Sequence, residues 1–86
     1  MNTFDVTFHH VDGENYNEYQ IIYHNNGKSL LKELMRDDII FLVTKSNVLG
    51  ESETEYKAIN VSNIVQVDIE RSRFSKKQQY ELVKFD

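Results

Sequence analysis

Histidines are concentrated at the start of the chain, together with four carboxylates, and these residue types could form a metal site or an acid–base pair. The three histidines, His9, His10 and His24, all lie within the first 24 residues. Imidazole is the commonest metal ligand and a frequent general base near neutral pH. His9 and His10 are neighbours on a predicted strand, however, so their side chains point to opposite faces.

The third histidine is too distant to complete a site. The hairpin register that we favour places His24 opposite Thr3, about 20 Å from His9 at roughly 3.3 Å per strand residue. A zinc ion needs its ligands within about 2.2 Å of one point. We therefore expect an acidic hairpin with scattered imidazoles, no bound metal and no cofactor.

Two groups of neighbouring carboxylates could bind a cation. Asp37 and Asp38 follow the predicted helix. The members of the second group alternate with Ser and Thr and so share one face of a loop or strand start; they are Glu51, Glu53 and Glu55. Neither group has the Asp-x-Asp-x-Asp-Gly spacing of a calcium loop. We interpret both as solvated edges.

The chain lacks the usual nucleophile motifs. It has no cysteine and no Gly-x-Ser-x-Gly sequence. "NNGKS" resembles part of a phosphate loop, but the upstream glycine and the parallel βαβ setting are missing. Because acid, base and nucleophile do not come together, we expect that the chain is not an enzyme.

Length and composition indicate one small domain over residues 1–86. The absence of cysteine fits a reducing compartment. No apolar run reaches the roughly 20 residues that a membrane span needs, and the N-terminus does not resemble a signal peptide. We expect a cytoplasmic protein without membrane contact. The excess of Phe, Tyr, Ile, Asn and Lys over Gly, Ala, Arg and Pro indicates an AT-rich genome, such as a low-GC bacterium or its phage.

The N-terminal segments "TFDVTFHHV" and "NEYQIIYHN" alternate with the period of half-buried strands, and Asp12–Gly13 between them is a hairpin signal. Two registers keep the apolar residues on one face. A two-residue turn pairs Val6 with Tyr19, whereas a four-residue loop pairs Val6 with Ile21. We favour the second register, because it forms three apolar cross-strand pairs.

The remaining elements follow from periodicity. "NNGKSLLKELMRDD" predicts a helix of about ten residues, capped by Asn26 or Ser29, with an apolar stripe of Leu30, Leu31, Leu34 and Met35. "IIFLV" predicts a central strand covered on both faces. "SNVLGESE" predicts a loop, in which Val48 and Leu49 either close the end of the core or form an exposed apolar anchor. "TEYKAIN" and "IVQVDIE" predict two further strands joined by "VSN".

The predicted fold is a small α+β domain in the order β-β-α-β-β-β. Its mostly antiparallel sheet is curved, or half-closed into a barrel, with one helix on a face. Residues 71–86 form a basic C-terminal segment of ambiguous structure, for which we favour a short helix or turn followed by an edge strand, a possible sixth strand. The predicted core consists of Phe4, Val6, Phe8, Tyr19, Ile21, Leu30, Leu34, Ile40, Leu42, Tyr56, Val65, Val67 and Ile69.

The charge pattern indicates a binding module. The net charge is −4, and residues 1–27 contain no lysine or arginine. We expect an acidic sheet surface that docks on a basic protein partner, as a phage or mobile-element inhibitor that mimics nucleic acid would. The expected contacts are Asp12, Glu14, Glu18, Glu51, Glu53 and Glu55.

Two alternatives stay open. The first is nucleic-acid binding through the basic segment, with contacts at Arg71, Arg73, Phe74, Lys76 and Lys77. A simpler interpretation of the same residues is that they close onto the acidic strands of the same molecule or of a dimer mate. The second alternative is a structural or oligomerisation domain, for example a homodimer.

Overall fold

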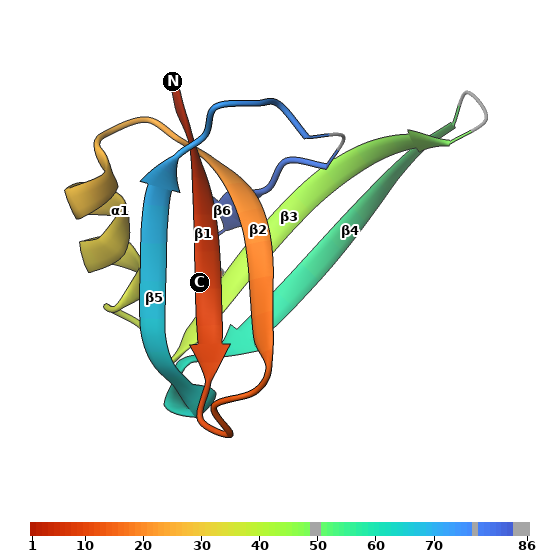
Figure 1. Cartoon of the computed structure of the whole chain (residues 1–86). Helices are drawn as coiled ribbons and strands as arrows, with labels where there is room; N and C mark the ends of the chain where they lie inside the picture. The colour runs from red at the N-terminus through yellow and green to blue at the C-terminus, as the bar shows by residue number, and fades with distance from the viewer. Residues whose placement is uncertain (49–50, 77, 84–86) are drawn as a thin grey trace.

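The computed structural model describes residues 1–48, 51–76 and 78–83, with the backbone alone for 45–48 and 51–53. Most of these residues lie in strands (Figure 1). In chain order the elements are β1 (Asn2–His10), β2 (Tyr16–Tyr23), α1 (Gly27–Leu34), β3 (Ile39–Val48), β4 (Glu51–Asn60), the 3-10 helix η1 (Val61–Asn63), β5 (Ile64–Arg71) and β6 (Glu81–Val83). The predicted α+β class with mostly antiparallel strands is confirmed, but the described strands form two sheets rather than the single sheet expected. The half-barrel stays a prediction.

The strands form two antiparallel sheets of three, in the orders β2-β1-β5 and β4-β3-β6. Tyr80 links them. Its N–H donates to the Gln20 carbonyl and its carbonyl accepts from the Ile22 N–H, both at 2.8 Å, so the chain pairs with β2 just before it enters β6. Figure 1 shows the β3–β4 hairpin projecting away from the first sheet.

The register of the first hairpin differs from the favoured prediction. Val6 lies opposite Tyr19 and Phe8 opposite Asn17, which is the alternative register. Both registers keep the apolar residues on one face, because they differ by an even number of residues. Phe8 still contacts Tyr19 diagonally, with ring centroids 6.0 Å apart. The register prediction was wrong because apolar pairing alone does not decide it.

The second hairpin is longer than expected. We predicted a loop at residues 46–53. For residues 46–48 and 51–53 that prediction was wrong, because the ladder of β3 and β4 continues to Val48 opposite Glu51. These residues are mostly polar, so their strand structure depends on backbone pairing rather than on an apolar face. Leu49 lies outside the described residues.

Two predicted core residues are exposed. Val65 is 64% exposed, because the ladder of β1 and β5 is irregular at His9/His10 and brings Ile64, rather than Val65, onto the core. Tyr56 is 63% exposed. Tyr56 lies opposite Val43. The core face of β3 instead carries the neighbouring residue Leu42, which is buried and lies opposite Lys57. Tyr56 therefore points to the other face.

The rest of the core agrees with the prediction, apart from partial burial at its edge. The buried residues are Phe4, Val6, Phe8, Ile21, Tyr23, Leu30, Leu34, Ile40, Leu42 and Tyr80, and those packed against them include Tyr19, Val67 and Ile69. Tyr80 was missed, because the tail carries no clear period.

The helix α1 packs beside β5 and is fixed at both ends (Figure 1). Asn26 caps it as expected, since its Oδ1 accepts from the Ser29 N–H at 2.8 Å. Farther along, the Tyr23 hydroxyl donates to Glu33, which raises the pKa of Tyr23. Only part of the predicted stripe is buried, because Leu31 is 39% exposed.

We expect Leu34→Ala to lower the free energy of unfolding by about 2–5 kcal/mol, because Leu34 is 1% exposed and its loss leaves a cavity. Urea denaturation measures the effect. Leu31→Ala, the same change on the exposed side of the helix, is the control and should cost much less. Equal stability losses in the two variants would show that the helix docks through another face.

Candidate functional site

The face of the first sheet that points away from the core carries most of the acidic side chains of that sheet. We call it the outer face. Strand alternation places on it Thr3, Asp5, Thr7 and His9 from β1, Tyr16, Glu18 and Gln20 from β2, and Gln66, Asp68 and Glu70 from β5. Four of these residues are carboxylates, and none is a lysine or arginine.

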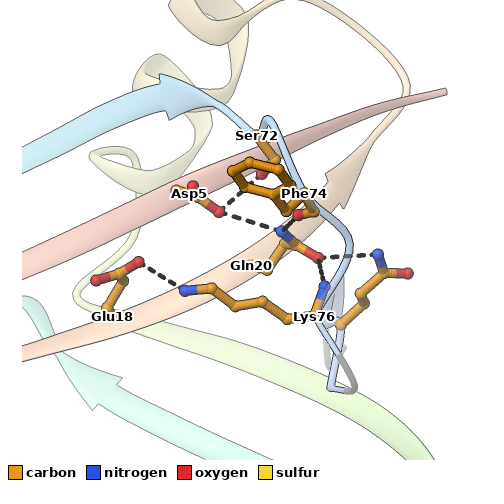
Figure 2. Close-up of polar contacts among 7 residues, drawn as sticks. Asp5, Glu18, Gln20, Ser72, Phe74 and Lys76 are labelled. Carbon is orange, nitrogen blue, oxygen red and sulfur yellow. Dashed lines mark hydrogen bonds and ion pairs between the residues drawn. The ribbon is translucent and has the colours of Figure 1, made fainter.

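Gln20, on the edge strand β2, is the buried residue of this face, with 1% of its surface exposed. Its Nε2 donates to the Phe74 carbonyl at 2.7 Å and to Asp5 Oδ1 at 3.2 Å. Its Oε1 accepts from the Lys76 N–H and from Gln79 Nε2, both at 2.9 Å (Figure 2). Two donors and two lone pairs are thus all satisfied, which a buried amide requires.

The segment that covers Gln20 consists of residues 72–76, which we call the covering segment. Ser72 Oγ donates to Asp5 Oδ1 at 2.8 Å, and the Ser72 N–H donates to the Thr3 carbonyl at 2.9 Å. At the other end Lys76 Nζ lies 2.7 Å from Glu18 Oε1. This hydrogen bond to Glu18 raises the pKa of Lys76.

The basic C-terminal segment therefore closes onto the acidic strands of its own molecule, as the simpler interpretation expected, through Lys76. Arg71 instead donates to Asn2 Oδ1 at 3.1 Å. Arg73 and Phe74 are exposed. Lys77 lies outside the described residues.

The three histidines have separate partners. His9 Nε2 lies 2.7 Å from Asp68 Oδ2, His10 contacts Asn17, and the His24 ring packs on Tyr23. Within the described part of the chain, no three histidine or acidic side chains come close enough together to hold a metal ion.

Asp68 is the most strongly engaged exposed carboxylate of the outer face. Gln66 Nε2 donates to its Oδ1 at 2.9 Å, and His9 contacts its other oxygen. The Gln66 bond first, and the His9 bond second, lower the pKa of Asp68. The contact with Asp68 fixes the His9 ring on the sheet surface.

The predicted acidic contacts fall in two separate places. Glu18 lies on the outer face and the Asp12–Glu14 loop lies at its end. In contrast, Glu55 lies on β4 opposite Thr44 and is half-buried. In Figure 1 the far end of the β3–β4 hairpin is remote from the β1–β2 loop. The side chains of Glu51, Glu53 and Val48 lie outside the described residues.

Asp12 has a structural role in the loop. Its Oδ1 accepts from the Glu14 and Asn15 N–H groups at 3.0 and 2.9 Å. The two backbone bonds, Asn15 first, lower the pKa of Asp12. Gly13 between them has a φ of 76°, a left-handed conformation that favours glycine. Glu14 is left as an exposed carboxylate at the tip.

A hollow of about 470 Å³ lies on another part of the molecule. It opens between the end of α1, the start of β3 and β6, and its lining is Glu33, Leu34, Arg36, Asp37, Asp38, Ile39, Ile40, Phe41, Leu82 and Val83. Sequence reasoning identified Asp37 and Asp38 as a pair, but it did not find the apolar side chains beside them, to which the tail contributes Leu82 and Val83.

Sequence reasoning also missed Gln20. An outward-facing glutamine on an alternating strand is normally solvated, and only its contact with the covering segment distinguishes it. No local signal in the sequence predicts this contact, because the partners lie more than 50 residues apart.

Comparisons with known proteins add no assignment, since no family model, no curated protein and no solved structure matches the chain. In the part of the chain that the structure describes, no helix is long and apolar enough to cross a membrane.

We expect Gln20→Leu to lower the free energy of unfolding by about 1–3 kcal/mol, because it leaves the Lys76 N–H and the Phe74 carbonyl without partners in a partly buried place. Urea denaturation measures this. Gln78→Leu, the same change at an exposed position, is the control. An unchanged unfolding midpoint for Gln20→Leu would show that the amide is not needed to hold the segment.

The lowered pKa of Asp68 predicts an acid-dependent contribution to stability. A carboxyl group whose pKa is lower in the folded state stabilises the fold above its ordinary pKa of 3.8 and loses that effect as the pH falls through the folded value. We expect the carboxyl carbon of Asp68 to titrate below 3.8 in an NMR experiment. In Gln66→Ala its midpoint should move up. A wild-type midpoint at or above 3.8 would contradict the hydrogen-bond geometry.

Proposed function

We propose that the chain is a non-catalytic binding module whose outer face docks on the basic surface of a protein partner. The observation that supports this most directly is intramolecular: Lys76 Nζ lies 2.7 Å from Glu18 Oε1, on a face whose own strands contribute no lysine or arginine to it. The same face would accept lysine or arginine side chains from another molecule.

Carboxylates remain accessible after the covering segment has closed. Glu70 on β5 and Glu14 in the loop are exposed, and the Asp68 side chain is 52% exposed. Glu70 and Asp68 are carried by the paired strand β5 and Glu14 by a hydrogen-bonded loop, so their backbone positions are largely fixed before binding. Charges arranged in this way speed association and make it sensitive to salt.

The class of partner follows from this chemistry. A surface rich in lysine and arginine is typical of proteins that hold the phosphates of nucleic acid. The chain would then compete with nucleic acid for that surface and act as an inhibitor. The AT-rich composition supports a phage or mobile element as its source.

An oligomerisation domain is the second candidate. It is favoured by β4, which lies at the edge of its sheet and presents a largely exposed strand. Exposed strand edges are templates for pairing with another chain. Sedimentation at several concentrations tests it, and a monomer at all of them would exclude a stable homodimer.

We expect the double variant Glu14→Lys, Glu70→Lys to associate about 10-fold or more slowly with the partner at low salt, because it reverses the exposed charges of the outer face. The partner is first captured with the wild-type chain and identified. Association rates are then measured at low and high salt, and the difference should shrink as salt rises.

The control changes the net charge equally at sites away from the outer face. Asp37→Lys, Glu81→Lys reverses two carboxylates that are also exposed. The proposal is wrong if this control slows association as much as the outer-face variant, or if neither variant slows it.

A further inference from the structure

We infer that the chain has a second site, which binds single-stranded nucleic acid at the end of the first sheet, beside the start of β1. A pocket of about 240 Å³ lies there, and its lining is Met1, Asn2, Thr3, Arg71, Ser72, Arg73, Phe74 and Ser75. The site adjoins the acidic outer face at Thr3 but has different charged residues, and it does not rest on the partner proposed for that face.

The charged side chains that line this pocket are Arg71 and Arg73, and no carboxylate is among the lining residues. This is unusual in a chain with a net charge of −4. Guanidinium groups match phosphate oxygens in charge and in planar geometry. Arg71 is oriented by its bond to Asn2 Oδ1, and the Ser75 hydroxyl in the same lining can donate a further hydrogen bond.

Phe74 supplies the second half of the site. Its side chain is 83% exposed, while its own carbonyl accepts from Gln20 Nε2 at 2.7 Å. Two residues later, the Lys76 N–H donates to Oε1 of the same glutamine. The ring is thus held out into solvent on a backbone that is tied to the sheet. Exposed aromatic rings beside basic groups are the usual stacking platforms for unpaired bases.

A single strand fits this arrangement better than a duplex. A base can stack on the Phe74 ring only when it is free of its own stack, which favours unpaired strands. The two arginines can neutralise the phosphates on either side of such a base. The acidic outer face begins nearby, at Asp5, and would repel a longer contact with the phosphate backbone.

The small footprint sets the salt dependence. Each neutralised phosphate of a single strand contributes about −0.7 to the slope of log affinity against log salt. Two arginines therefore give a slope of about −1.4. Lys76 adds little to it, because this lysine is already paired with Glu18.

The test measures the binding of a fluorescent ten-nucleotide oligo-dT, and of an abasic strand of the same length, by anisotropy at low salt. We expect the abasic strand to bind more weakly. Phe74→Ala should weaken oligo-dT binding by about 5- to 150-fold, the usual effect of losing one stacked base, and leave abasic binding unchanged. Phe74→Tyr should retain binding.

The charge part has a matched control. Arg73→Glu should weaken the binding of both strands, whereas Lys32→Glu, an equal change of charge at an exposed helix position, should not do so to the same degree. The inference is overturned if the wild-type chain binds neither strand, or if it binds the abasic strand as tightly as oligo-dT. Equal losses in Arg73→Glu and Lys32→Glu would overturn it as well.

Discussion

A buried amide that must have all its hydrogen bonds met is the constraint on which this structure depends. Gln20 points away from the core and would be solvated if the sheet ended there. It is instead covered by a segment from the far end of the chain, which satisfies both ends of the amide. The backbone of Gln20 also holds the chain that leads to β6, because the Gln20 carbonyl accepts from the Tyr80 N–H. One residue thereby positions the connection between the two sheets.

The functional surfaces follow from this connection. The covering segment seats Lys76 on the acidic face and at the same time presents Phe74 to solvent. An acidic face and a small basic pocket therefore lie close together and share Thr3, but their charged residues differ, for example Glu70 on the face and Arg73 in the pocket. Their opposite charges let each be probed without altering the other.

Local patterns predicted the faces of the strands and narrowed the helix cap to Asn26 or Ser29, of which Asn26 is the one used, because these features depend on nearby residues. The hairpin register was not predictable from apolar pairing, since both registers bury the same face, and the hydrogen bonds of Asp12 shape the loop instead. Val65 was misplaced by an irregular ladder. The site was harder still, because the role of Gln20 arises from the distant covering segment, residues 72–76.

Amide hydrogen exchange of Lys76 tests this account most directly. This N–H lies outside any strand, and its described acceptor is the Gln20 side chain at 2.9 Å. If the buried amide holds the covering segment, the Lys76 N–H should exchange about 100-fold or more slowly than in an unstructured peptide. Exchange at the unstructured rate, while the strand amides of β1 stay protected, would contradict the account.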